Sequence, residues 1–255
     1  MVTEIPTGSL TTIIENKIAT IEFGHPASNS LPGELLRRLT QEFHNLSANP
    51  AVSVIVIKST GTGVFCAGAS FDELLAVSNH EEGIRFFSGF AHLINAMRCC
   101  KQLIIGRVQG KAGGGGVGIA AACDYTFATS ASSIKLSELA IGIGPFVIEP
   151  AVSRKIGKAA MGEMTLEAHE WKTPEWAHLK GLYAKVVENQ TELENEVAHL
   201  ASKLASYNPE ALTGMKKVLW EGTENWETLL LERAAISGKL VLSEATKKAL
   251  TQFKK

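Results

Sequence analysis

The stretch KAGGGGVGIAAAC, from Lys111 to Cys123, decides the fold, and it directly follows the apolar segment QLIIGRV at residues 102–108. A buried strand that leads through a glycine-rich turn into a helix is typical of α/β proteins with parallel sheets. Four consecutive glycines cost conformational entropy, so they indicate backbone that approaches another group closely. A helix that begins here points free N–H groups and its positive dipole end at a ligand. Tight packing against a neighbouring strand is the alternative, and we favour a ligand.

A second segment upstream has the same organisation. FCAGASFDELL (Phe65–Leu75) follows the apolar run VSVIVIKST at residues 52–60, and its small residues lead into a helix. Two such loops can each present one backbone N–H to the same ligand oxygen, which is the arrangement of an oxyanion hole. A nearby carboxylate then moves a proton at the adjacent carbon.

The rest of the chain extends this α/β pattern. A β-hairpin is predicted over residues 10–23, helices over 31–48 and 80–100, and short strands at DYTFAT and SIKLS. Helical segments dominate from about Pro150 onward, with one short strand at GLYAKVV. Because no Pro-, Ser- or Gly-rich linker divides the two parts, we expect a single domain over residues 1–255.

Composition excludes several classes of protein. The 25 Lys and Arg residues balance 26 Asp and Glu residues, which removes the electrostatic case for nucleic acid binding. No apolar run approaches the roughly 20 residues that span a bilayer, and the first ten residues do not resemble a secretory signal. The four cysteines form no C-x-x-C pair and no H-E-x-x-H motif occurs, so we expect no metal site and a cytoplasmic location.

The glycine run also matches a dinucleotide-binding fingerprint. Gly113, Gly115 and Gly118 have the G-x-G-x-x-G spacing, and Glu138 lies where a ribose-binding acid is expected. However, that acid normally ends the next strand, whereas Glu138 lies beyond it. Nothing later in the chain resembles the second half of a dinucleotide fold, so this interpretation ranks second.

Three motifs together carry a family resemblance. FCAGASFDEL, IIGRVQGKAGGGGVGIAAACDYTFAT and IKLSELAIGIGP resemble the crotonase, or enoyl-CoA hydratase/isomerase, superfamily, and the similarity covers nearly the whole chain. It implies an α/β fold: a spiral of ββα turns over about residues 1–190 and a helical trimerisation region over about 191–255. It also implies a homotrimer, or a hexamer made of two trimers.

The resemblance assigns roles to residues of the two loops. Ala69 and Gly115 are implied to donate their backbone N–H groups to a thioester oxygen, and Glu138 is implied to act as acid and base. The resemblance also implies that the substrate is an acyl-CoA thioester, with coenzyme A as part of the substrate and no separate cofactor. Other residues implied to bind the substrate or its CoA part are Ala67, Gly68, Ser70, Phe71, Asp72, Gly114 and Gly116, the last opening a helix.

One position departs from the family pattern. Gly118 stands where hydratases carry a second glutamate. Syn addition of water is usually served by two carboxylates, whereas one is enough to shuttle a proton between the α and γ carbons of an enolate. Glu149 is a candidate second acid, but an acid in the first turn of the next helix is also favoured by the helix dipole, and we prefer that interpretation.

We therefore expect an enoyl-CoA hydratase/isomerase that works through an enolate. Hydration is slightly favoured because it is the commonest activity among relatives. Isomerisation and decarboxylation by a single-carboxylate enzyme are alternatives. Outside this class the alternatives are non-catalytic proteins that bind acyl-CoA or a dinucleotide.

Overall fold

A computed structural model of the chain describes residues 7–253, so most of the opening ten residues lie outside the described part. The predicted hairpin is confirmed: β1 (Ser9–Glu15) and β2 (Ile18–Gly24) pair antiparallel. Asn16 and Lys17 form the turn between them with positive φ angles of 51° and 66°, which suits a two-residue hairpin.

The main sheet has the order β1-β2-β3-β4-β6-β8. Its other strands are β3 (Val54–Ser59), β4 (Leu103–Val108), β6 (Tyr125–Thr129) and β8 (Lys185–Val187), and all pairs after the hairpin are parallel. Within residues 7–253 the strand order never reverses. The sheet therefore lacks the point of reversed strand order at which dinucleotide-binding folds hold their ligand.

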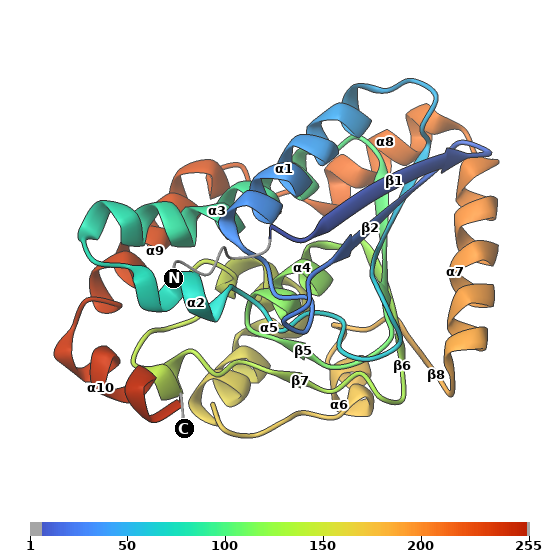
Figure 1. The fold of residues 1–255 in the computed structure, drawn as a ribbon. Coiled ribbons are helices and arrows are strands. Elements are labelled where there is room, and N and C mark those ends of the chain that lie inside the picture. Colours follow the sequence, from blue (N-terminus) through green and yellow to red (C-terminus); the bar gives the residue numbers. More distant parts are fainter. Residues whose placement is uncertain (1–6, 254–255) are drawn as a thin grey trace.

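The two faces of the sheet pack differently, because successive side chains of a strand point to opposite faces. Val54 and Val56 pack against α7 (Gln190–Ala205), which lies along one face. Ile55 and Ile57 point into the main core, on the side where Figure 1 shows α1 (Gly33–Ala48) and the other helices. Fully buried strands of this kind read as continuous apolar runs, as predicted.

A smaller sheet and the remaining helices complete the fold. β5 (Ala112–Gly113) and β7 (Ile134–Lys135) pair in parallel beside the main sheet, close to the glycine run. The predicted helical C-terminal part is confirmed, and in the described part of the chain no helix is long and apolar enough to cross a membrane. The other helices are α2 (Phe71–Ala76), α3 (His80–Cys99), α4 (Gly115–Ala122), η1 (Leu139–Ile141), α5 (Glu149–Leu166), α6 (Pro174–Leu179), α8 (Pro209–Leu219), α9 (Trp226–Leu240) and α10 (Glu244–Phe253).

A buried carboxylate fastens α8 to the sheet. Asp124 accepts hydrogen bonds from the backbone N–H of Ile104, from Nζ of Lys216 and from Nε1 of Trp220, each over 2.7 Å. The Asp124 and Lys216 side chains are only 4% and 3% exposed. Lys216 is the cation that bonds directly to Asp124, so removing one partner of this pair would leave the other buried without it.

Candidate active site

The two small-residue loops touch each other. The backbone N–H of Gly113 donates to the carbonyl of Cys66 over 2.9 Å, which ties the second loop to the first. A Cβ atom added to Gly68 would lie 2.9 Å from the Gly113 oxygen and 3.1 Å from the Gly115 nitrogen. Gly68 also has a φ of 95°, a conformation that favours glycine. The close approach of the loops therefore requires a glycine at this position.

Two backbone N–H groups at this junction are free. Leu31 holds the residues on either side of Ala69, since its N–H donates to the Gly68 oxygen and its oxygen accepts from Ser70. Gly115 begins α4, so its N–H has no partner within that helix. Among the residues that the structure describes, neither the Ala69 nor the Gly115 N–H has a hydrogen-bond partner. Both are available to a ligand oxygen.

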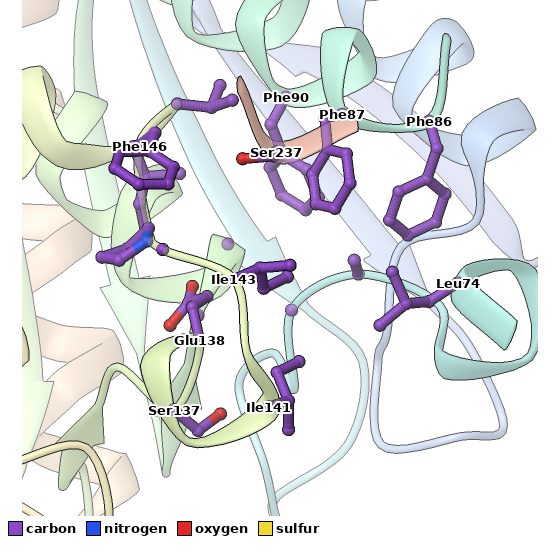
Figure 2. A pocket seen from close by; sticks show the side chains of 18 of the residues that line it. Leu74, Phe86, Phe87, Phe90, Ser137, Glu138, Ile141, Ile143, Phe146 and Ser237 are labelled. Atoms are coloured by element: carbon purple, nitrogen blue, oxygen red, sulfur yellow. The ribbon is translucent and has the colours of Figure 1, made fainter. Parts of the chain in front are cut away.

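Glu138 lies next to the same junction. A Cβ atom on Gly114 would come within 3.0 Å of Oε1 of Glu138, so the carboxylate is against the glycine run. Its Oε2 is buried and has no hydrogen-bond partner among the described residues, and Figure 2 shows the carboxylate among cavity-lining side chains. Burial raises the pKa of Glu138 from the ordinary 4.5 to about 7. Near neutral pH this group can therefore both accept and donate a proton.

A cavity of about 150 Å³ opens beside these groups. Three phenylalanines of α3 form one wall, and Figure 2 shows them across the cavity from Glu138. An apolar cavity of this volume holds a group about the size of benzene. The apolar side chains that line it include Phe71, Leu74, Phe86, Phe87, Phe90, Ile141, Ile143, Pro145, Phe146, Val147 and Ile148.

The structure brings most of the predicted site residues together. Those that line the cavity are Ala67, Gly68, Ala69, Phe71, Gly114, Gly115 and Glu138. Four others, Ser70, Asp72, Gly116 and Glu149, do not line it. Ser70 accepts a hydrogen bond from the Glu73 N–H at the start of α2, and Asp72 is exposed on that helix. Gly116 packs against Cys66, and α4 begins one residue before it, at Gly115.

The cavity holds one carboxylate in the described part of the chain. A Cβ atom on Gly118 would lie 2.6 Å from Cγ2 of Ile148, so the isoleucine covers the place toward which a side chain at 118 would point. Glu149 does not line the cavity. Glu149 lies in the first turn of α5. Its carboxylate accepts a hydrogen bond from Ser153 over 2.6 Å and forms an ion pair with Lys158.

Among the lining residues that sequence reasoning missed, two bear directly on the chemistry of the cavity. Ile148 gave no signal, because its importance depends on contact with Gly118 from another helix. Ser237 lines the cavity from α9, which the sequence assigns only to the helical C-terminal part. Its neighbour Gly238 is a partial signal, since glycine within a helix is unfavourable unless close packing requires it.

The chain is similar in sequence to known enzymes. The chain is 28% identical to a short-chain-enoyl-CoA hydratase of Clostridium acetobutylicum over 242 residues, which cover 94% of this chain and 92% of the relative. It is 29% identical to the peroxisomal Delta(3,5)-Delta(2,4)-dienoyl-CoA isomerase of Arabidopsis thaliana, covering 77% and 74% of the two chains.

Solved structures support the same assignment at the level of the fold. An enoyl-CoA hydratase from Bacillus halodurans superposes with a TM-score of 0.88 at 22% identity, covering 95% of this chain and 99% of the other. This confirms the predicted crotonase-type α/β fold. The profile of the enoyl-CoA hydratase/isomerase family matches residues 13–255. The chain is therefore a member of the enoyl-CoA hydratase/isomerase family of enzymes.

Proposed function

We propose that this enzyme acts on an acyl-CoA thioester through an enolate, with Ala69 and Gly115 binding the thioester oxygen and Glu138 moving the proton. One observation carries the proposal: Oε2 of Glu138 and the N–H groups of Ala69 and Gly115, none of which has a partner among the described residues, meet at the same cavity. Buried polar groups are usually paired, so three unpaired groups around one space indicate a polar ligand.

The chemistry follows from this arrangement. Glu138 removes a proton from the acyl chain, the C–H electron pair moves into the enolate, and negative charge develops on the thioester oxygen. The Ala69 and Gly115 N–H groups stabilise that charge because the fold holds both donors in place before the reaction. A pKa of about 7 suits Glu138 to accept the proton and return it near neutral pH.

A specific observation favours isomerisation as the reaction of this enolate. Adding water is best served by a second carboxylate, whereas moving a double bond requires only one group that takes a proton from one carbon and returns it to another. Gly118 provides no carboxylate, and Ile148 covers its Cα. Hydration, the activity in the name of the Clostridium acetobutylicum relative, is the first candidate function. We propose isomerisation as the second.

The decisive experiment follows both proton transfer and product formation. The enzyme is incubated in D2O with butyryl-CoA, crotonyl-CoA and a 3-enoyl-CoA, and the thioesters are analysed by mass spectrometry. We expect deuterium at the α carbon, and its loss in Glu138→Gln with binding retained. Hydrated crotonyl-CoA would identify a hydratase, and a shifted double bond an isomerase. No exchange in the wild-type enzyme with any bound thioester would overturn the proposal.

The oxyanion donors need a control for packing. A Cβ atom at Gly115 would lie 2.2 Å from the Phe90 ring, so any substitution there collides with the ring. A Phe90→Ala background removes the ring that a Cβ at residue 115 would meet in both Gly115→Ala and Gly115→Pro, and only proline lacks the N–H. We expect kcat about 100- to 1,000-fold lower for the proline variant than for the alanine variant. Equal kcat values would remove Gly115 from the oxyanion hole.

We also propose a homotrimer or a hexamer of two trimers. Met215, Val218 and Leu219 lie at helical spacing on α8 and are 46%, 54% and 44% exposed, and exposed apolar faces mark interaction surfaces. Light scattering of the purified protein tests this.

The four cysteines are free, which supports a reducing, cytoplasmic location.

A further inference from the structure

The hydroxyl of Ser237 is a buried polar group of the cavity that the proposed reaction does not use and that has no partner among the described residues. Ser237 is 1% exposed, and its Oγ makes no hydrogen bond to any residue in the described range. A serine within a helix can usually donate back to a carbonyl one turn earlier, and this one does not. A buried hydroxyl without a partner is unfavourable, so it calls for a ligand atom.

Close packing of two helices brings Ser237 into the cavity. A Cβ atom on Gly83 of α3 would lie 2.6 Å from the Gly238 oxygen, and one on Gly238 would lie 2.7 Å from the Ile84 nitrogen. The two helices therefore cross backbone to backbone, which only glycine allows. Ser237 is the residue before Gly238, at the point where α9 contacts α3. The Ser237 hydroxyl therefore lies at the cavity beside the phenylalanines of α3.

The surroundings of Ser237 decide which chemistry it can recognise. Figure 2 shows it with Phe87 and Phe90, away from Glu138. No Lys, Arg or His among the described residues lines the cavity, and Glu138 is its only charged group. A carboxylate on the ligand would be desolvated without a counter-charge and would face Glu138, which is costly. A neutral carbonyl oxygen can instead accept a hydrogen bond from the Ser237 hydroxyl, and a ligand hydroxyl can either accept from it or donate to it.

We propose that Ser237 is a specificity-determining residue that binds an uncharged oxygen, a hydroxyl or a carbonyl, on the part of the acyl chain remote from the thioester. The inference rests on the proposed function, because that function places the thioester at Ala69 and Gly115. The cavity volume of about 150 Å³ suits a chain of about six non-hydrogen atoms. The preferred substrates are therefore short, oxygenated acyl thioesters.

Binding measurements test this separately from catalysis. Dissociation constants of hexanoyl-CoA, its 4-, 5- and 6-hydroxy derivatives, a 5-oxo derivative and adipoyl-CoA are measured by calorimetry. We expect at least one hydroxy or oxo derivative to bind the wild-type enzyme about 2- to 10-fold more tightly than hexanoyl-CoA, the range of one neutral hydrogen bond. Adipoyl-CoA, with its terminal carboxylate, should bind more weakly than hexanoyl-CoA.

Two variants complete the design. Ser237→Ala should abolish the preference for the oxygenated chain and leave hexanoyl-CoA affinity unchanged or higher. Ser137→Ala, a matched serine that also lines the cavity, should retain the preference. A wild-type enzyme without any preference, or a preference that persists in Ser237→Ala, would overturn the inference. If the wild-type enzyme exchanges no α proton with any thioester, the proposed function is refuted. The binding preference can still be measured in that case, because it does not depend on turnover.

Discussion

Replacing Glu138 with glutamine removes a carboxyl group whose ionisation opposes folding. Burial raises the pKa of Glu138 from 4.5 to about 7, so between these values the folded enzyme holds a proton that the unfolded chain has released. The free energy of unfolding of the wild-type enzyme therefore falls as pH rises through this window and changes no further above it. A difference of one pH unit in pKa corresponds to about 1.4 kcal/mol, so the whole loss is about 3 kcal/mol.

Glutamine has nearly the same shape and no charge, so Glu138→Gln should not show this loss. Between pH 5 and pH 8, the stability of the variant relative to the wild-type enzyme should rise by about 2 to 3 kcal/mol. Urea unfolding of both proteins at the two pH values, without ligand, measures this difference. Other titrating groups cancel in the comparison, because the two proteins differ only at Glu138.

The same experiment contains its own refutation. If the stability difference between the two proteins is equal at pH 5 and pH 8, Glu138 titrates normally and its carboxylate is solvated. The base of the proposed reaction would then lack the raised pKa. As a control, Glu149→Gln should not become relatively more stable at high pH, because Lys158 and Ser153 hold the pKa of Glu149 below its ordinary value.

Three further outcomes follow from the structure. The rate constant kcat/KM for α-proton exchange should fall about tenfold per pH unit below about pH 7, where Glu138 becomes protonated, and a flat profile would assign the base elsewhere. Gly118→Glu alone should destabilise the enzyme by about 1 to 3 kcal/mol through contact with Ile148, whereas Gly118→Glu with Ile148→Ala should fold and gain crotonyl-CoA hydration. Lys216→Met should lower the stability by about 3 to 5 kcal/mol, seen as a lower Tm, because the buried Asp124 carboxylate loses the cation that bonds to it; adding Asp124→Asn should recover part of that loss.

Much of this protein is encoded in local patterns. The hairpin, the buried strands, the two small-residue loops and the helical C-terminal part are all predicted and all found, because each depends on residues close together in the chain. Glu138 and the loop residues Ala69 and Gly115 are likewise predicted, and the structure brings them to one cavity. Glu149 is the instructive case, since sequence permits either an active-site acid or a helix-terminal acid. Its contacts with Ser153 and Lys158 follow the second pattern.

The sequence by itself determined the family, the order of the elements and the residues proposed to stabilise and protonate the enolate. Only the tertiary structure decided what surrounds them. Ile148 covers Gly118, and Ser237 enters the cavity because Gly83 and Gly238 let two helices meet backbone to backbone. Contacts of this kind join residues far apart in the chain, and no local spacing or propensity encodes them. The volume and polarity of the cavity, and therefore the choice of substrate, depend on those contacts.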